Sequence, residues 1–251
     1  MPMRLTDDVE LLDGLPIIYI KSLNSLVVAD LHLGYEGVMA KKGALLPKVN
    51  LRKITGMLAD ALGRTKAAEI IVNGDIKNEF STVDEEEFNE LFDFINFAKE
   101  KGVALNLIKG NHDNFVERYK AQFKLKVAHQ EERISKYLFF HGEDLPKDTK
   151  GAGMLIMGHE HPSIGVYNSV GTKEKVRCFL YGHYKKIPLL VLPAMNYYAG
   201  GTDINLQPKS SLLSPIFKHV DVDEMRAIAV GFGSTLDFGT IGKLRMSARA
   251  D

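Results

Sequence analysis

Three short apolar runs, with stretches of helical periodicity between them, constrain the fold of this 251-residue chain more than any other feature. The runs are LVVAD, EIIVNGD and VALNLIKG, at residues 26–30, 69–75 and 103–110. Near-continuous apolar runs of this length are typical of strands that are buried on both faces. The sequence therefore predicts neighbouring strands covered by helices.

Helical periodicity fills both intervals between these runs. Pro47 is expected to begin the first helix, and its apolar stripe consists of Val49, Leu51, Ile54, Leu58 and Leu62. In the second interval, Thr82 and Glu85 have the spacing of a capping box, and apolar residues follow at helical intervals as far as Ile95. The pattern predicts two successive βαβ-like units.

From about residue 137 the chain is rich in short strands. The expected strands are KYLFFHG, MLIMGHEH, SIGVYN, VRCFLYG, IPLLVLP and RAIAVGF. No Pro/Gly/Ser-rich linker divides the sequence, so we expect one domain over residues 1–251, with an antiparallel or mixed sheet packed after the βαβ-like units. The long stretch without periodicity at 194–215 is expected to be a functional loop.

Side chains able to bind metal follow five of the apolar runs, at the point where each run ends. They are Asp30 and His32, Asp75, Asn111 with His112 and Asp113, His141, and His159 with His161. Residues two apart in an extended segment project to the same side, so the Asp30–His32 and His159–His161 pairs can each share a ligand. Ligands bind beyond the carboxyl ends of strands in open α/β sheets, which predicts one common site. The glycines expected to permit crowding there are Gly74, Gly110, Gly142 and Gly158.

The donor types in this set indicate which ions it suits. Carboxylate, amide and imidazole groups without a thiolate favour manganese, iron, zinc or cobalt. The ligands are too many for one tetrahedral ion, whereas two ions that share a carboxylate would use them all. Metal pairs about 3.5–4 Å apart recur in enzymes that displace groups at phosphorus. A single histidine is more often a core or capping residue, but five strand ends together predict a dinuclear phosphoesterase.

The ordered motifs DLHLG, NGDIKNE, GNHD, HG and GHEHP resemble those of the calcineurin-like metallophosphoesterases, over roughly residues 26–166. Two later segments, LVLPAMNYYAGGTDINL and GFGSTLDFGT, resemble the ligase-associated DNA damage response endonuclease subgroup. The resemblance implies an α/β protein, a four-layer α/β/β/α sandwich of two mixed sheets.

The same resemblance implies roles for the site residues. One metal ion would be held by Asp30, His32 and His161, and a second by Asn111, His141 and His159, with Asp75 bridging the two. Manganese is the expected metal. Two cations would neutralise the phosphate oxygens and lower the pKa of a bridging water, whose hydroxide attacks phosphorus in line.

His112 is implied to donate the proton to the leaving oxygen, with Asp113 orienting or stabilising it. Alternatively, His112 only hydrogen-bonds to a metal-bound carboxylate and supports it.

The charge pattern bears on the substrate. A net charge of zero argues against a protein that mainly coats nucleic acid. The charge is segregated, however. Residues 31–66 hold seven basic and two acidic residues, and residues 171–190 hold five basic and one acidic residue. Such runs either form a solvated face or contact a phosphate backbone.

We expect a phosphodiesterase, a nuclease for single-stranded or flap DNA, that works in DNA repair beside another repair enzyme. Two alternatives remain. One is a phosphodiesterase or phosphatase for a small nucleotide or other small phosphate ester. The other is a non-catalytic metal-binding partner of a repair enzyme.

The remaining sequence features concern compartment and assembly. Cys178 is the single cysteine, so no intrachain disulfide can form, and the thiol is expected to fill the core. The N-terminal segment lacks the features of a signal peptide, and no apolar stretch is long enough to span a membrane. We expect a cytoplasmic protein. A homodimer would cover exposed sheet edges.

Overall fold

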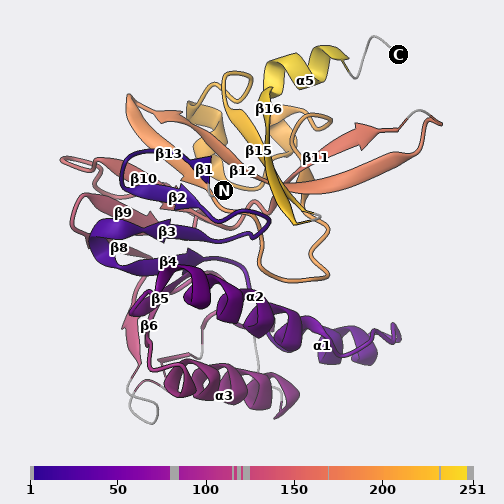
Figure 1. The fold of residues 1–251 in the computed structure, drawn as a ribbon. Coiled ribbons are helices and arrows are strands. Elements are labelled where there is room, and N and C mark those ends of the chain that lie inside the picture. Colours follow the sequence, from indigo (N-terminus) through magenta and orange to yellow (C-terminus); the bar gives the residue numbers. More distant parts are fainter. Residues whose placement is uncertain are drawn as a thin grey trace.

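The computed structural model describes residues 3–79, 85–114, 116–117, 120, 125–168, 170–231 and 233–247. Two mixed β-sheets stack face to face, and helices cover the outer face of each (Figure 1). No helix in these described ranges is both long and apolar enough to cross a membrane.

The first sheet has the strand order β1-β2-β3-β4-β5-β6-β7. Its strands are β1 (Met3–Arg4), β2 (Val9–Leu11), β3 (Ile18–Ile20), β4 (Ser25–Val28), β5 (Glu69–Asn73), β6 (Ala104–Ile108) and β7 (Lys126–Ala128). Strands β4 to β7 run parallel to one another, whereas β1 to β4 pair antiparallel. The three central strands are those predicted from the apolar runs. Their carboxyl ends therefore lie at one edge.

Three helices lie on the outer face of this sheet (Figure 1). They are α1 (Tyr35–Lys41), α2 (Asn50–Thr65) and α3 (Glu85–Glu100). Helix α2 begins at Asn50 and not at Pro47, because the Glu36 carboxylate accepts the backbone N–H groups of Val49 and Asn50 at 3.0 and 2.8 Å. The proposed capping residue Thr82 lies outside the described residues.

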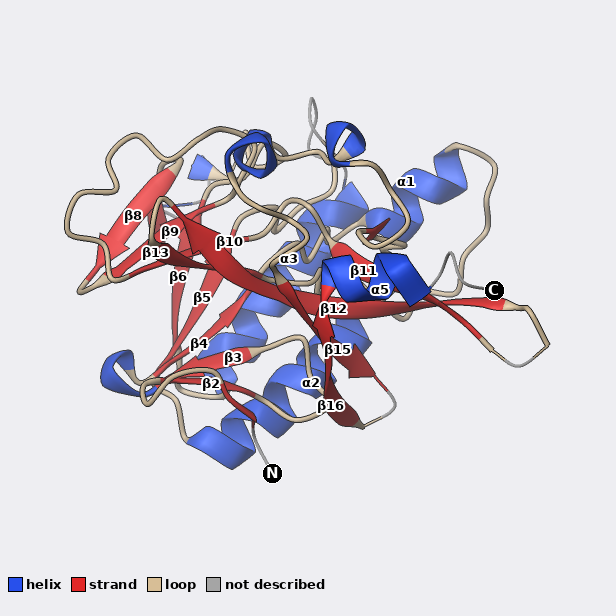
Figure 2. Cartoon of the chain, turned by 90° about the horizontal axis from the view of Figure 1, so that it is seen from above, coloured by secondary structure: helices blue, strands red, loops and turns tan. Residues whose placement is uncertain are grey.

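The second sheet contains nine strands in the described part of the chain. They are β8 (Glu131–Ile134), β9 (Tyr137–Phe140), β10 (Met154–Met157), β11 (Pro162–Tyr167), β12 (Lys173–Tyr184), β13 (Ile187–Val191), β14 (Thr202–Asp203), β15 (Arg226–Gly231) and β16 (Ser234–Thr240). Strands β9, β10 and β13 are parallel, and the hairpin of β11 and β12 is antiparallel. The sheet is therefore mixed, as expected. The β11–β12 hairpin extends beyond the rest of the molecule (Figure 2).

Three hydrophobic cores separate the four layers. The first lies between α2, α3 and the first sheet, the second between the two sheets, and the third on the outer face of the second sheet. The outer layer over that sheet is formed by α5 (Ile241–Ser247) and the 3₁₀-helix η3 (Pro215–His219), with η2 (Lys209–Ser211) nearby; the chain also has the 3₁₀-helix η1 (Lys21–Leu23). The predicted four-layer sandwich is confirmed. Cys178 is fully buried in the third core, and burial raises the pKa of its thiol.

The sequence patterns missed the short N-terminal strands β1 to β3, and also β7, β8, β14, β16, α1 and α5. These elements are short, or their sequences alternate with charged residues. Strands β2 and β3 become buried only because they extend the first sheet beside β4. Pairing with a neighbour, and not local composition, therefore determines them.

Candidate metal centre

The carboxyl ends of β4, β5 and β6 meet those of β9 and β10 where the two sheets adjoin. Asn73, the last residue of β5, joins the sheets because its side-chain N–H groups donate to the carbonyls of Phe140 and Ile156, both at 3.1 Å. The carbonyl of Asn73 also lies 3.2 Å from His141 Nδ1. Polar groups from both sheets are thereby brought to one place.

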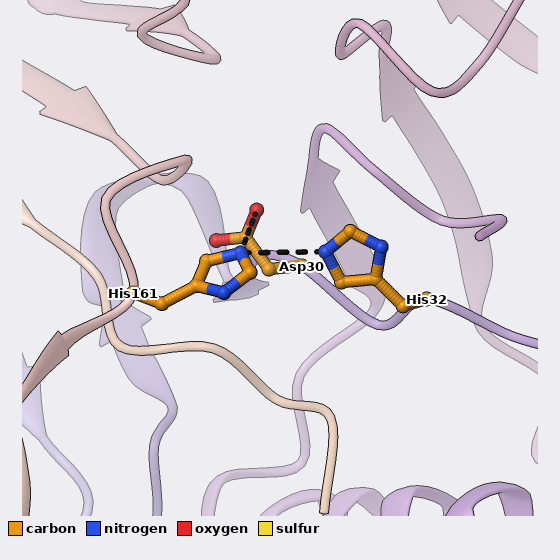
Figure 3. A group of neighbouring side chains, drawn as sticks. All are labelled: Asp30, His32 and His161. Carbon is orange, nitrogen blue, oxygen red and sulfur yellow. Dashed lines mark hydrogen bonds and ion pairs between the residues drawn. The ribbon is translucent and has the colours of Figure 1, made fainter. Parts of the chain in front are cut away.

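Asp30, His32 and His161 form one group of neighbouring donors (Figure 3). The Nε2 atoms of His32 and His161 are 3.3 Å apart, and His161 Nε2 lies 3.1 Å from Asp30 Oδ1. The Asp30 carboxylate is fully buried and accepts the backbone N–H of His159 at 3.2 and 3.1 Å. Its position is therefore set by the other sheet.

Asp75 joins a second and a third group. Its Oδ2 lies 3.1 Å from His141 Nε2, and His159 Nδ1 lies 3.3 Å from that same nitrogen. The same Oδ2 is 3.8 Å from the Nε2 atoms of both His32 and His112. The three groups are Asp30–His32–His161, His32–Asp75–His112 and Asp75–His141–His159, and in each the donor atoms lie within 4.8 Å of one another. Asp75 thus belongs to the second and third groups, and His32 links the second group to the first.

The paired residues converge by a backbone geometry that differs from our expectation. Asp30, His32, His159 and His161 have φ values of 58°, 44°, 67° and 48°, and Asp75 has 51°. Extended-chain alternation is therefore the wrong explanation for the two i, i+2 pairs. All five residues adopt the left-handed region, which is uncommon for residues other than glycine and is found where surrounding structure enforces it, often at functional sites.

Asn111 lies between two residues that touch Asp75. The backbone N–H of His112 donates to Asp75 Oδ1 at 3.0 Å, and a Cβ atom on Gly110 would lie 2.2 Å from that oxygen. The Asn111 Oδ1 atom is buried and has no hydrogen-bond partner among the described residues. A buried acceptor of this kind is costly unless it binds something else, and a cation is a suitable partner.

The environments of His112 and Asp113 differ. His112 Nδ1 contacts the backbone carbonyl of Asn78, which leaves Nε2 on the side of Asp75. The Asp113 carboxylate is buried and accepts hydrogen bonds from three backbone N–H groups, those of Asp75, Gly110 and Lys77, at 2.8, 2.9 and 3.3 Å. These bonds hold together the two loops that carry Asp75 and His112. Burial, together with the nearby Asp75 charge, raises the pKa of Asp113 to about 7.

A buried ion pair that the sequence did not predict supports the same loop. Lys77 Nζ lies 3.3 Å from Glu87 Oε2, and both side chains are almost completely buried. The other Glu87 oxygen accepts the backbone N–H groups of Asn78 and Glu79 at 2.8 and 2.7 Å. Helix α3 therefore positions the carbonyl that contacts His112.

Two asparagines from distant segments hold the backbone of His32. Asn50 and Asn196 are both buried, and their side-chain amides donate to the carbonyl of Leu31, each at 3.1 Å. They also reach the carbonyl of His32, at 3.5 and 3.3 Å. The sequence carried no signal for Asn50. Asn196 lies in the resemblance motif PAMNYYAG, but its role became evident only from these contacts.

Residues of strand β12 and of the turn between β10 and β11 anchor the long loop at 194–215. The buried Glu160 carboxylate, between two site histidines, accepts the backbone N–H of Ser214 at 3.0 Å. Three basic side chains also donate hydrogen bonds to this loop. Lys173 donates to the Asp203 carboxylate at 2.8 Å, Lys175 to the Gly201 carbonyl at 2.8 Å, and Arg177 to the Tyr197 carbonyl at 2.6 Å. These internal contacts favour an anchoring role for the three side chains over contact with a phosphate backbone, one of the two alternatives that their charge left open.

The four histidines of the candidate centre differ in pKa, because burial lowers the pKa of some and a neighbouring carboxylate raises that of others. Burial lowers the pKa of His32 and His159 to about 4, so both rings are neutral at pH 7. Burial also disfavours charge on His141, but the adjacent Asp75 outweighs it and raises the pKa of His141 to about 10. Asp30 likewise outweighs burial and raises the pKa of His161. The site therefore attracts positive charge at two places.

The donor set fits a pair of metal ions. Four imidazoles, two carboxylates and the amide oxygen of Asn111 are present, and the ring nitrogens approach one another closely. Two divalent cations would satisfy all of these lone pairs. The His141 Nδ1–H group would donate to the Asn73 carbonyl, which fixes the tautomer with a free lone pair on Nε2.

Gly110→Ala should disrupt the centre by overpacking. The added Cβ would lie 2.2 Å from Asp75 Oδ1 and 2.6 Å from its backbone nitrogen, so the two loops must separate. We expect a loss of about 1–3 kcal/mol in unfolding free energy, measured by chemical denaturation, and weaker metal binding.

Gly56→Ala is the control, because a Cβ on this α2 residue meets nothing within 4 Å. It should stabilise the protein by about 0.5–1 kcal/mol. Equal stability of both variants would contradict this packing.

A pocket adjoins Asn111. Its volume is about 270 Å³. The lining residues are Lys109, Gly110, Asn111, Asn114, His129, Gln130 and Glu143. The other two histidines outside the centre, His183 and His219, are exposed.

Comparison with known proteins agrees with this geometry. The family model of the calcineurin-like phosphoesterases matches residues 23–184, about two thirds of the chain. The chain therefore belongs to the calcineurin-like phosphoesterase family, whose members hydrolyse phosphoric esters at a dinuclear metal centre. This confirms the family and the class of enzyme predicted from the motifs.

One solved structure shows a similar fold over nearly its whole length. The crystal structure of Pseudomonas putida nuclease MPE has a TM-score of 0.65 at 18% identity, over 94% of this chain and 99% of that one. The E. coli phosphoesterase Yfce has a TM-score of 0.43 at 13% identity, over 86% of this chain and 98% of its own. A search of curated proteins finds no match.

Proposed function

We propose that this protein is a metal-dependent phosphodiesterase that cleaves DNA. The observation that carries the proposal is the position of Asp75, whose Oδ2 lies 3.1 Å from His141 Nε2 in one donor group and 3.8 Å from His32 Nε2, a member of another. One cation would be held by Asp30, His32 and His161, and the other by Asn111, His141 and His159. Asp75 would contact both.

The bound cations would neutralise phosphate charge and activate water for attack on phosphorus. The protein's own residues would supply the proton for the leaving group and position the group that donates it. His112 would present Nε2–H to the leaving oxygen, because its Nδ1 is held at the Asn78 carbonyl. Asp113 would keep the loops of His112 and Asp75 in register through its backbone hydrogen bonds. It acts on position and not on the proton itself.

Three observations support DNA as the substrate. The fold matches a nuclease over nearly all of both chains. The late motifs resemble those of a DNA-repair endonuclease subgroup. Exposed basic residues also lie on α2, next to the loop of His32. We propose manganese as the metal and DNA repair as the setting, with single strands or flaps as the preferred form.

The pocket beside Asn111 favours one alternative. A space of about 270 Å³ beside Asn111, a proposed ligand of the second cation, would suit the organic group of a small phosphate ester. The enzyme would then act on a small nucleotide or a similar compound.

A cleavage panel tests the proposal. Purified protein with Mn²⁺ is assayed on p-nitrophenyl phosphate, bis-p-nitrophenyl phosphate, single-stranded DNA, flap DNA and duplex DNA. Cleavage of the diester and of DNA, with DNA cleavage falling steeply as salt rises, supports a nuclease. Turnover of small esters alone, with weak salt dependence, indicates the alternative. No hydrolysis of any substrate would contradict both and favour a non-catalytic protein.

Metal binding should expel protons at neutral pH. His141 has a pKa of about 10 when paired with Asp75, so it is protonated at pH 7.5 and must become neutral to bind a cation. His32 and His159 are already neutral there and release nothing. We expect about one proton or more per protein, and an affinity that rises with pH. Calorimetry with Mn²⁺ in buffers of different ionisation enthalpy measures the number of protons released on binding. Binding without proton release, equally strong at pH 6 and 8, would contradict the His141 assignment.

A further inference from the structure

Three tyrosines from two distant parts of the chain meet beside the metal centre. Tyr35 begins α1, and Tyr197 and Tyr198 lie in the loop at 194–215. The rings of Tyr35 and Tyr198 are nearly parallel, with centroids 5.9 Å apart and an interplanar angle of 14°. Tyr197 meets Tyr198 edge-on, at 5.1 Å and 82°. We call these three residues the tyrosine cluster.

Hydrogen bonds fix the tyrosine cluster to the segment that carries His32. The backbone N–H of Tyr35 donates to the His32 carbonyl at 3.3 Å. The backbone N–H of Tyr197 donates to Asn50 Oδ1 at 2.8 Å, and the amide of Asn50 in turn donates to the Leu31 carbonyl at 3.1 Å. The rings therefore keep a set position relative to the proposed cations.

The cluster has an exposed aromatic face with a cation beside it. Tyr197 is 49% exposed, and it belongs to none of the three hydrophobic cores of the described chain. Lys53 Nζ, on α2, lies 5.6 Å from the centroid of the Tyr197 ring. Arg52 precedes it and is exposed as well. An exposed ring next to basic side chains can bind a flat group and an adjacent anion together.

We propose that the tyrosine cluster and Lys53 form a stacking site for an unpaired nucleobase of the DNA strand whose phosphodiester is held at the metal centre. This inference rests on the proposed function and names the form of its substrate. Aromatic side chains bind bases by stacking with little sequence preference, and cations hold the flanking phosphate. In a duplex both faces of a base are covered by its neighbours, so the site selects single strands and unpaired ends.

The test compares strands with and without bases. Fluorescence anisotropy measures the binding of metal-loaded protein to a labelled oligothymidylate and to an abasic strand of the same length. Both carry phosphorothioate linkages, which keep the charge and resist cleavage. Wild-type protein should bind the base-bearing strand roughly 5- to 100-fold more tightly. Tyr197→Leu should lose most of this preference, while Tyr197→Phe, which keeps the ring, should retain it.

Controls separate this inference from the proposed function. Tyr167→Leu alters another exposed tyrosine, on β11, and should keep the wild-type preference. Thermal unfolding of each variant confirms folding. If wild-type protein fails to hydrolyse bis-p-nitrophenyl phosphate, the proposed function fails. If it hydrolyses this ester but Tyr197→Leu discriminates between the strands as wild type does, or Tyr197→Phe loses discrimination as Tyr197→Leu does, the stacking site is overturned.

Discussion

Asp75→Asn should reduce hydrolysis of bis-p-nitrophenyl phosphate by roughly 10³-fold or more, since a cation contributes several kcal/mol to the transition state and each 1.36 kcal/mol is a factor of ten. Asp75 is the one carboxylate shared between donor groups in the described chain, with His141 at 3.1 Å and His32 and His112 at 3.8 Å. An amide has the shape of the carboxylate but lacks its charge. The variant should therefore hold fewer metal ions, even though it folds.

Two measurements test this prediction. Turnover gives the rate, and elemental analysis of the dialysed protein gives the number of metal ions per chain. Asp60→Asn is a matched control, because Asp60 is an exposed α2 residue that pairs with Arg64 one helical turn later. Its rate and metal content should be those of wild type. A fully active Asp75→Asn protein with unchanged metal content would refute the dinuclear centre.

His112→Ala should produce a loss that depends on the leaving group. DNA has a poor alkoxide leaving group that requires a proton, so its cleavage should fall by about 10²–10⁴. A p-nitrophenolate leaves without protonation, and hydrolysis of its diester should fall far less. The structural basis is the contact of His112 Nδ1 with the Asn78 carbonyl, which directs Nε2 to the side of Asp75.

The comparison requires both substrates and one control. His219→Ala changes an exposed histidine at the end of η3 and should leave both rates unaltered. Equal losses of His112→Ala on DNA and on the nitrophenyl diester would mean that the imidazole supports Asp75 and does not donate the proton. Metal analysis of the variant then shows whether that support is needed for binding.

The strands of the site could be predicted because burial is encoded locally. The runs around Val27, Ile71 and Leu107 are almost continuously apolar, which is typical of strands inside a covered sheet. The candidate metal-binding side chains follow these strands directly, so the order of strand and candidate ligand predicted one common site. The short strands β2 and β3 of the same sheet could not be predicted, since pairing with a neighbouring strand stabilises them.

The sequence by itself determined the chemistry of this protein: the family, the central strands and the set of donors at their ends. The tertiary structure alone decided how those donors face one another, through left-handed backbone at Asp30 and Asp75. It also decided which distant residues support them, as in the hydrogen bond from Tyr197 to Asn50, 147 positions apart. The physical reason is that apolar burial is a property of a short segment, whereas a hydrogen bond between two loops exists only after the sheets that carry them have packed.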